Sequence, residues 1–344
     1  SREIEVEDGA HVNNITVNPI KQFEFPAGKS FILNNGLKVL HHDNPLVGKI
    51  DIILDFKTKP YFEAQNQQGI LNLVADLLLE GTTKFSSTEL ATELESNGIN
   101  IYSIPGQIQI SLLSKDLDKV LSILFDILTD SQFTQNSIEK IKEHTISDIK
   151  NFWDSPNQFI GQLIKEKIYR NHPYSKNSLG TIEFIEKVKR EDLVNYYKQS
   201  VSPDGAKLSI VGDISGYNLE QVIKKYLGNW QGPKIVEPEF PEIQKIKFEE
   251  FNHNINRDQT VLAYAGISLK RLDPDFDKLF IFDQIFTGGI LGSMSSKLFE
   301  LRERSGLFYT IGGSLIARCD KQPGMVYIKT IVSNDRLKES EIAI

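Results

Sequence analysis

Cysteine is almost absent from this sequence, because Cys319 is the only cysteine among 344 residues. A single cysteine excludes any disulfide bond within the chain, and with it the disulfide-stapled class of small secreted domains. This cysteine usage fits the cytoplasm or an organelle matrix, and it fits equally a periplasmic protein without disulfides. The compartment therefore stays open.

Long apolar runs and an excess of basic residues are also missing. The most apolar stretch, 70–79, is interrupted by Asn72 and Asp76. It is too short to cross a bilayer, which takes about 20 apolar residues. The chain has 39 basic and 46 acidic residues, a net charge of −7, and no basic cluster interleaved with aromatic residues. We therefore expect a soluble chain with no membrane span and no nucleic-acid partner.

The first part of the chain has a length and pattern that predict an arm followed by a domain. Residues 1–29 have weak periodicity, and Pro19 and Pro26 break regular structure there, so we expect a linker or N-terminal arm. The sequence starts at Ser1 without a methionine or a signal-peptide pattern, which is typical of a processed or excised segment. Residues 30–232 alternate strand-like and helix-like segments and are expected to form the first domain.

Prolines among alternating charges predict an interdomain linker over 233–246, and the pattern then begins again over 247–344. A shift of 208 positions places Ser87 on Ser295 and Gly98 on Gly306, which favours an internal repeat. We predict an α+β fold of two homologous domains, each a mainly antiparallel sheet covered by helices, with the second domain incomplete.

The segment 68–82 has helical spacing with polar residues at positions where a metal site would need ligands. Positions 72 and 76 lie one helical turn apart, so their side chains could reach one metal ion. Asn72 is a poor zinc ligand, and Asp76 alone leaves a site without nitrogen donors. Ala75, between them, cannot take a proton from a metal-bound water.

This segment resembles the helix of the pitrilysin/insulinase family of zinc metallopeptidases that carries the inverted motif H-x-x-E-H, with Asn72, Ala75 and Asp76 at the motif positions. Other parts of the family pattern follow in order, and they are 33–39, 172–174, 180–181 and 206–213. In 33–39 the pair Asn35-Gly36 predicts a tight hairpin turn with positive backbone angles. The resemblance implies half of a two-part peptidase clamshell that has lost its zinc motif.

The resemblance also places the family's third zinc ligand within 143–149, where Asp148 is the best match. Asp76, Asp148 and His144 could form a degenerate site. Such an oxygen-rich set would favour weak binding of a hard cation over zinc. The alternative is that these are polar groups left in a decayed site. We expect no metal and no other cofactor in this chain.

A second resemblance lies at 295–309, which is similar to the family segment L-R-E-x-x-G-L-x-Y. In that family an arginine and a tyrosine seven positions apart, here Arg302 and Tyr309, come from the half without zinc and reach toward the substrate in the other half. A guanidinium and a phenol can donate hydrogen bonds to a peptide carbonyl and stabilise a tetrahedral intermediate. The alternative is structural, with Arg302 in a helix-end salt bridge and Tyr309 filling a sheet face.

The glycine-rich stretch 288–292 lacks the lysine and the spacing of a phosphate-binding loop. A flexible turn before the next helix is the simpler interpretation. The family's noncatalytic subunits can carry a glycine-rich loop that contacts substrate, so Gly288, Gly289 and Gly292 are candidate substrate-binding positions.

The resemblance implies the noncatalytic half or partner subunit of a zinc metallopeptidase. Its expected partners are a zinc-bearing catalytic half or subunit, fused or separate, and a peptide substrate, and Arg302 and Tyr309 would assist the partner's zinc site. Two alternatives remain open at this point. One is a structural or assembly homologue of the family, and the other is a peptide-binding module without a proteolytic role.

Overall fold

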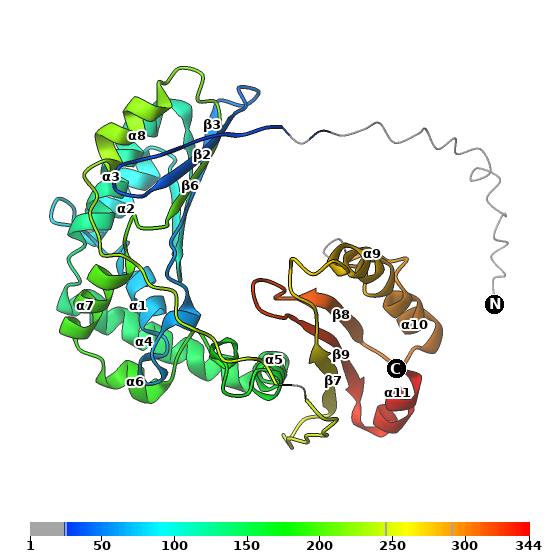
Figure 1. Cartoon of the computed structure of the whole chain (residues 1–344). Coiled ribbons are helices and arrows are strands. Elements are labelled where there is room, and N and C mark those ends of the chain that lie inside the picture. The colour runs from blue at the N-terminus through cyan, green and yellow to red at the C-terminus, as the bar shows by residue number, and fades with distance from the viewer. Residues whose placement is uncertain (1–23, 25, 245, 290–291) are drawn as a thin grey trace, which may run out of the picture.

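The computed structural model describes residues 24, 26–244, 246–289 and 292–344. They form two units, each a β-sheet with helices packed on it, which confirms the predicted α+β class and the two helix-covered sheets (Figure 1). Most of the predicted arm lies outside the described residues. The boundaries predicted at 232/233 and 246/247 stay predictions.

The first sheet has six strands in the order β1-β2-β6-β3-β5-β4. Its strands are β1 (Lys29–Ile32), β2 (Lys38–Asp43), β3 (Lys49–Asp55), β4 (Asn100–Ile104), β5 (Gln107–Leu113) and β6 (Lys207–Gly212). β6 is inserted between β2, to which it is parallel, and β3, to which it is antiparallel. Alternation in β3 buries Ile50, Ile52 and Leu54 on one face, which is the face that the helices cover.

Among the described residues, eight α-helices belong to the first unit. They are α1 (Ile70–Leu77), α2 (Ser87–Ser96), α3 (Leu117–Asp130), α4 (Gln135–Asp154), α5 (Pro156–Ile168), α6 (Ile182–Lys187), α7 (Arg190–Ser200) and α8 (Leu219–Leu227). α1 packs against α4 and α7, and α3 packs against α8. α2 starts with a capping box, in which Ser86 and Glu89 satisfy each other's backbone N–H groups.

The second unit has a three-stranded antiparallel sheet in the order β7-β9-β8. Its elements are β7 (Gln259–Ile267), α9 (Phe276–Phe286), α10 (Lys297–Ser305), β8 (Thr310–Ala317), β9 (Met325–Ser333) and α11 (Leu337–Ala343). α9 and α10 pack on β8, and α11 packs on β9. Between α8 and β7, the described residues form no helix or strand.

The second unit repeats part of the first. β5 is followed by the 3-10 turn Ser114–Asp116 and then α3, and β9 is followed by the 3-10 turn Asn334–Arg336 and then α11. β3, α1, α2 and β4 likewise match β7, α9, α10 and β8 in order. Within the described ranges, the second unit contains no counterpart of the elements from α4 to β6.

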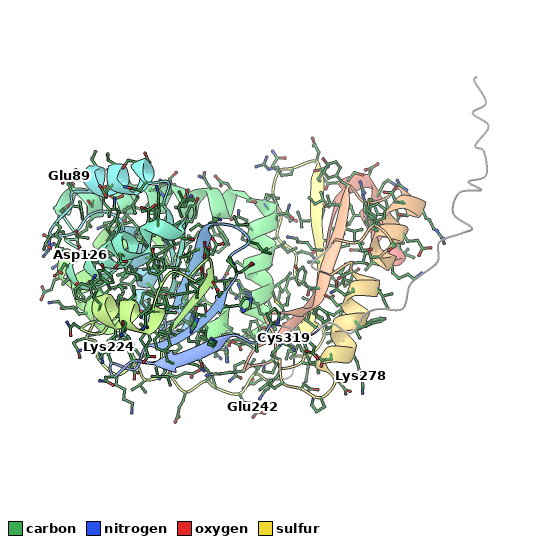
Figure 2. The ribbon with its side chains drawn as sticks, turned by 90° about the horizontal axis from the view of Figure 1, so that it is seen from above. Glu89, Asp126, Lys224, Glu242, Lys278 and Cys319 are labelled. Carbon is green, nitrogen blue, oxygen red and sulfur yellow. The ribbon has the colours of Figure 1, made fainter. Side chains whose placement is uncertain are left out.

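An aromatic and aliphatic cluster joins the two units. Tyr169 and Tyr174 of the first unit pack with Met325 of the second, and the Tyr169 hydroxyl donates a hydrogen bond to the Pro323 carbonyl at 3.2 Å. The connecting segment adds Phe240, whose ring lies 5.5 Å from that of His172. Cys319 lies near this junction when the two units are viewed from above (Figure 2).

The predicted turn at Asn35-Gly36 needs a correction. Gly36 has a φ of 92°, as predicted, whereas Asn35 does not have a positive φ. The loop is longer than a two-residue turn, because the Leu33 N–H donates to the Leu37 carbonyl at 3.0 Å. Asn35 has a different role, since its amide nitrogen donates to the carbonyls of Leu227 and Trp230 at 2.8 and 2.9 Å.

Candidate functional site

The N-terminus of α1, the helix with the degenerate motif, is held by a buried carboxylate. Glu63 accepts hydrogen bonds from the backbone N–H groups of Gly69 and Leu71, both at 2.9 Å. Burial raises the pKa of Glu63 to about 7, although these two donors and the Lys176 ammonium favour the ionised form. Sequence reasoning missed Glu63, because no local capping rule links a residue to N–H groups six and eight positions later.

The three motif positions lie on α1 as the sequence predicted, but their chemistry does not fit zinc. Ala75 is 3% exposed and packs in the interior. The amide nitrogen of Asn72 donates to a carboxylate oxygen of Asp76 at 3.5 Å, a long contact. Neither residue can supply the imidazole nitrogen that a zinc site of this type needs, so no zinc-dependent step is assigned to this helix.

Asp76 is the most perturbed of these groups. Burial raises the pKa of its carboxyl to about 6, the nearby His144 lowers it, and Asp148 and Glu80 raise it. His144 and Asp148, which act on this pKa, lie on α4, the helix that packs on α1.

The α4 residues of this set are themselves paired. His144 Nδ1 lies 3.1 Å from a carboxylate oxygen of Asp148, and both side chains are exposed. Among the residues that the structure describes, no group of three or more His, Cys, Asp or Glu side chains is arranged to hold a metal ion. The geometry therefore describes a polar surface patch on α1 and α4.

Arg302 lies on the last turn of α10 and is fixed to the chain that follows. Ser296 caps the start of this helix, and Gly306, with a φ of 60°, ends it by donating its N–H to the Arg302 carbonyl at 3.0 Å. The Arg302 Nε donates to the carbonyl of Tyr309 at 3.1 Å, and Nη1 pairs with the Glu303 carboxylate at 3.1 Å. The guanidinium thus connects the end of α10 to Tyr309, the residue that directly precedes β8.

The Tyr309 side chain projects into solvent, with 72% of the residue's surface exposed. Its backbone is held, because its N–H donates to the Ile331 carbonyl at 3.0 Å. The preceding residues Leu307 and Phe308 are buried against Val332. The backbone that carries the phenol is therefore tied to β9, and within the described part of the chain the Tyr309 hydroxyl makes no hydrogen bond. Tyr309 does not fill a sheet face.

The three candidate glycines lie between α9 and α10. Gly288, Gly289 and Gly292 all have positive φ values, of 92°, 53° and 57°. The Ser293 N–H donates to the Gly288 carbonyl at 3.2 Å. The positive φ at position 289 favours glycine, whereas a Cβ there would meet only the end of the Gln284 side chain, which can move.

The candidate residues fall into two groups on different units. The motif positions and Asp148 lie on α1 and α4, whereas Arg302, Tyr309 and the three candidate glycines belong to the unit of α10 and β8 (Figure 1). The structure does not bring the two groups together. Arg302 and Tyr309 are therefore not placed to act on the motif positions of α1 in the same chain.

Two family descriptions match the chain, one after the other. Residues 38–182 match "Insulinase (Peptidase family M16)", and residues 187–344 match "Peptidase M16 inactive domain". The chain belongs to this family. The change between the two matches falls inside the first structural unit, because β6 at 207–212 completes the first sheet.

Relatives in sequence carry mixed descriptions. The chain is 26% identical over 290 residues to "Uncharacterized zinc protease YmxG" of Bacillus subtilis, covering 82% of this chain and 69% of that one. It is 27% identical over 284 residues to "Non-peptidase homolog YmxG" of Helicobacter pylori, covering 79% of this chain and 63% of that one. With the inactive-domain match, these similarities favour a noncatalytic or partner half.

Solved structures share the fold. A peptidase M16 inactive domain from Pseudomonas fluorescens superposes with a TM-score of 0.79 at 20% identity, covering 92% of this chain and 77% of that one. The periplasmic protease PqqL of Escherichia coli superposes with a TM-score of 0.71 at 18% identity, covering 91% of this chain and 36% of that one. PqqL is thus long enough to contain more than one unit of this size. No helix among the described residues is long and apolar enough to cross a membrane.

Proposed function

We propose that this chain is the noncatalytic half or partner subunit of a zinc metallopeptidase of the M16 family. It closes a chamber around a peptide, binds the peptide backbone, and donates Arg302 and Tyr309 to a zinc site on its partner. The zinc belongs to the partner, since the donor set on α1 and α4 of this chain does not fit it.

The observation that carries this proposal is the solvent exposure of the Tyr309 side chain. Tyr309 is 72% exposed and follows the buried residues Leu307 and Phe308, so its phenol contributes little to packing and its hydroxyl is accessible as a hydrogen-bond donor. Arg302 supports the same segment through the Tyr309 carbonyl, and its guanidinium remains partly exposed. The two groups could donate to one peptide carbonyl and to the negative charge that develops on it.

A purely structural homologue is the second candidate. Its support is that Arg302 already makes two internal contacts, one to the Tyr309 carbonyl and one to Glu303. A structural role gives no reason for an exposed tyrosine hydroxyl, so we prefer the peptidase half. Gly288, Gly289 and Gly292 have a structural explanation in their positive φ values, and their contact with substrate stays a proposal.

Purification from the native source under mild conditions tests the assignment. We expect this chain to co-purify with a polypeptide that carries an intact H-x-x-E-H helix and about one zinc ion. That polypeptide is either separate or covalently joined to this chain. The purified assembly should cleave unstructured peptides, and this chain alone should not. The proposal would be contradicted if this chain purified without any such polypeptide. The protein concentration in this experiment should be one at which the extract still cleaves peptides.

A further inference from the structure

The junction between the two units contains a buried histidine. His172 directly precedes the 3-10 turn Pro173–Ser175, and only 2% of its surface is exposed. Its ring lies 6.0 Å from the ring of Tyr169, 4.8 Å from that of Tyr174 and 5.5 Å from that of Phe240. Tyr169 directly follows α5, whereas Phe240 belongs to the segment between α8 and β7. The imidazole therefore lies between the first unit and the segment that connects it to the second.

The second unit contacts the same tyrosine rings. Met325, the first residue of β9, is 9% exposed and packs with Tyr169 and Tyr174. The Tyr169 hydroxyl also donates to the Pro323 carbonyl at 3.2 Å. The two tyrosines thus connect His172 to the second unit.

A hydrogen bond to the backbone requires His172 in its neutral form. Its Nδ1 accepts from the Tyr174 N–H at 3.1 Å, so the ring proton of the neutral imidazole lies on Nε2. Nε2 is buried and makes no hydrogen bond within the described part of the chain. A protonated imidazole carries a proton on both nitrogens, so Nδ1 could no longer accept and the Tyr174 N–H would lose its partner.

No charge among the described residues favours the protonated form. Burial raises the pKa of Tyr169, and it raises that of Tyr174 to about 12, so both phenols that contact His172 are neutral near pH 7. The titratable groups of the elements packed around these rings are Tyr61, Lys176, Glu237, Arg318, Cys319 and Asp320. None of them acts on the pKa of His172, which burial alone lowers.

We propose that His172 makes the junction between the two units sensitive to acid. Neutral His172 stabilises the closed junction, in which its ring packs with Tyr169, Tyr174 and Phe240. Protonation favours an open junction, in which the imidazolium is in water and Met325 loses its contact with the tyrosines.

The pH range follows from the two states of the junction. In the open junction His172 has its ordinary pKa of about 6.5, and in the closed junction burial lowers that pKa. The stability of the closed junction is therefore fully present above about pH 6.5 and decreases as the pH falls toward the lowered pKa. Within this range the open population should rise by up to about tenfold per pH unit.

Two local measurements between about pH 7.5 and 5 test the proposal. The first is hydrogen exchange of the Tyr174 amide, corrected for the intrinsic effect of pH, and its protection should fall by up to about tenfold per pH unit below about pH 6.5. The second is oxidation of the two methionines by hydrogen peroxide, in which Met294, at 75% exposed, is an internal reference for Met325. The ratio of the Met325 rate to the Met294 rate should rise by the same factor. The amides of β3 should keep their protection, which distinguishes local opening from global unfolding.

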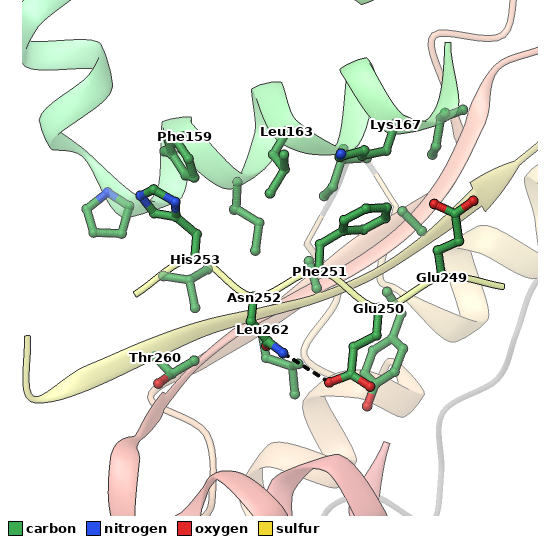
Figure 3. Close-up of a pocket in the computed structure, with 18 of the residues that line it drawn as sticks. Phe159, Leu163, Lys167, Glu249, Glu250, Phe251, Asn252, His253, Thr260 and Leu262 are labelled. Carbon is green, nitrogen blue, oxygen red and sulfur yellow. Dashed lines mark hydrogen bonds between the residues drawn. The ribbon is translucent and has the colours of Figure 1, made fainter. Parts of the chain in front are cut away.

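His172→Asn is the matched variant that cannot be protonated. An asparagine side chain accepts from the N–H two residues later, as His172 Nδ1 does. The lost ring should increase opening at every pH, and both measurements should then be independent of pH. His253→Asn is the control, because His253 is an exposed imidazole whose ring lies 4.5 Å from that of Phe159 in the first turn of α5 (Figure 3). This control should behave as the wild type.

The proposal is overturned if either measurement is independent of pH in the wild-type protein, or if His172→Asn shows the pH dependence of the wild type. Imidazole nitrogen NMR of the wild type decides the question even if His172→Asn does not fold. A proton on Nδ1 at about pH 7.5, or a His172 pKa of about 6.5 or higher, would also overturn it.

Discussion

Replacing Asp76 with asparagine should stabilise the protein, and the gain should depend on pH. The pKa of Asp76 is raised from 3.8 to about 6, mainly by burial, with Asp148 and Glu80 adding repulsion. The folded state therefore favours the protonated carboxyl, and ionisation weakens folding as the pH rises from about 4 through 6. Asparagine removes this penalty and can still accept the hydrogen bond from Asn72.

The size of the effect follows from the shift. A difference of about 2 pKa units corresponds to about 3 kcal/mol. Because the carboxylate is partly exposed and screened by solvent, we expect about 1–2 kcal/mol. The gain of Asp76→Asn over wild type should be small near pH 4.5, grow up to about pH 7 and then stay constant.

Urea unfolding of both proteins between pH 4.5 and 8 measures this difference directly. Glu95→Gln, an exposed carboxylate on α2, serves as the control and should change the free energy of unfolding by less than about 0.5 kcal/mol at each pH. A gain that is the same at all pH values would show that ionisation of Asp76 does not matter. A loss of stability at pH 8 would show that the charged carboxylate is favourably bound, and either result would refute the reasoning.

Two further predictions concern metal chemistry. The isolated chain should contain no stoichiometric zinc, and elemental analysis that finds one tightly bound zinc, lost on Asp76→Asn or Asp148→Asn, would contradict this. The triple change Asn72→His, Ala75→Glu and Asp76→His should restore at most partial zinc affinity in titration calorimetry, because the Asp148 side chain is one methylene shorter than glutamate and is already paired with His144. If this variant binds no zinc even with Asp148→Glu added, the alignment of α1 with the zinc helix is wrong.

The elements of the fold could be predicted because their sequence signals are local. β3 alternates apolar and polar residues, and α2 has a capping box at its start and Asn97-Gly98 at its end. The strand order could not be predicted in the same way. β6 joins the sheet more than 150 positions after β3, and no local pattern specifies the strand beside which it inserts.

The same distinction between local and nonlocal signals applies to the candidate site. The motif positions and the Arg302/Tyr309 spacing are visible in the sequence because they lie within one helix or one turn. Glu63 and the raised pKa of Asp76 depend on burial and on groups that other elements bring near, so the sequence gives no signal for them.

Turnover of the assembled enzyme with Arg302→Ala and Tyr309→Phe tests the central claim most directly. Arg304→Ala is the matched control, because Arg304 lies on the same helix and pairs with Glu300 at 2.5 Å. If Arg302 and Tyr309 stabilise the charge that develops on the peptide, Arg302→Ala and Tyr309→Phe should each lower kcat by about tenfold or more. Tyr309→Phe should leave the zinc content and the Tm unchanged. The control Arg304→Ala should have a kcat near that of the wild type. Wild-type kcat in Tyr309→Phe, together with an Arg302→Ala variant that loses only Tm, would show that the pair is structural and would contradict the proposed function.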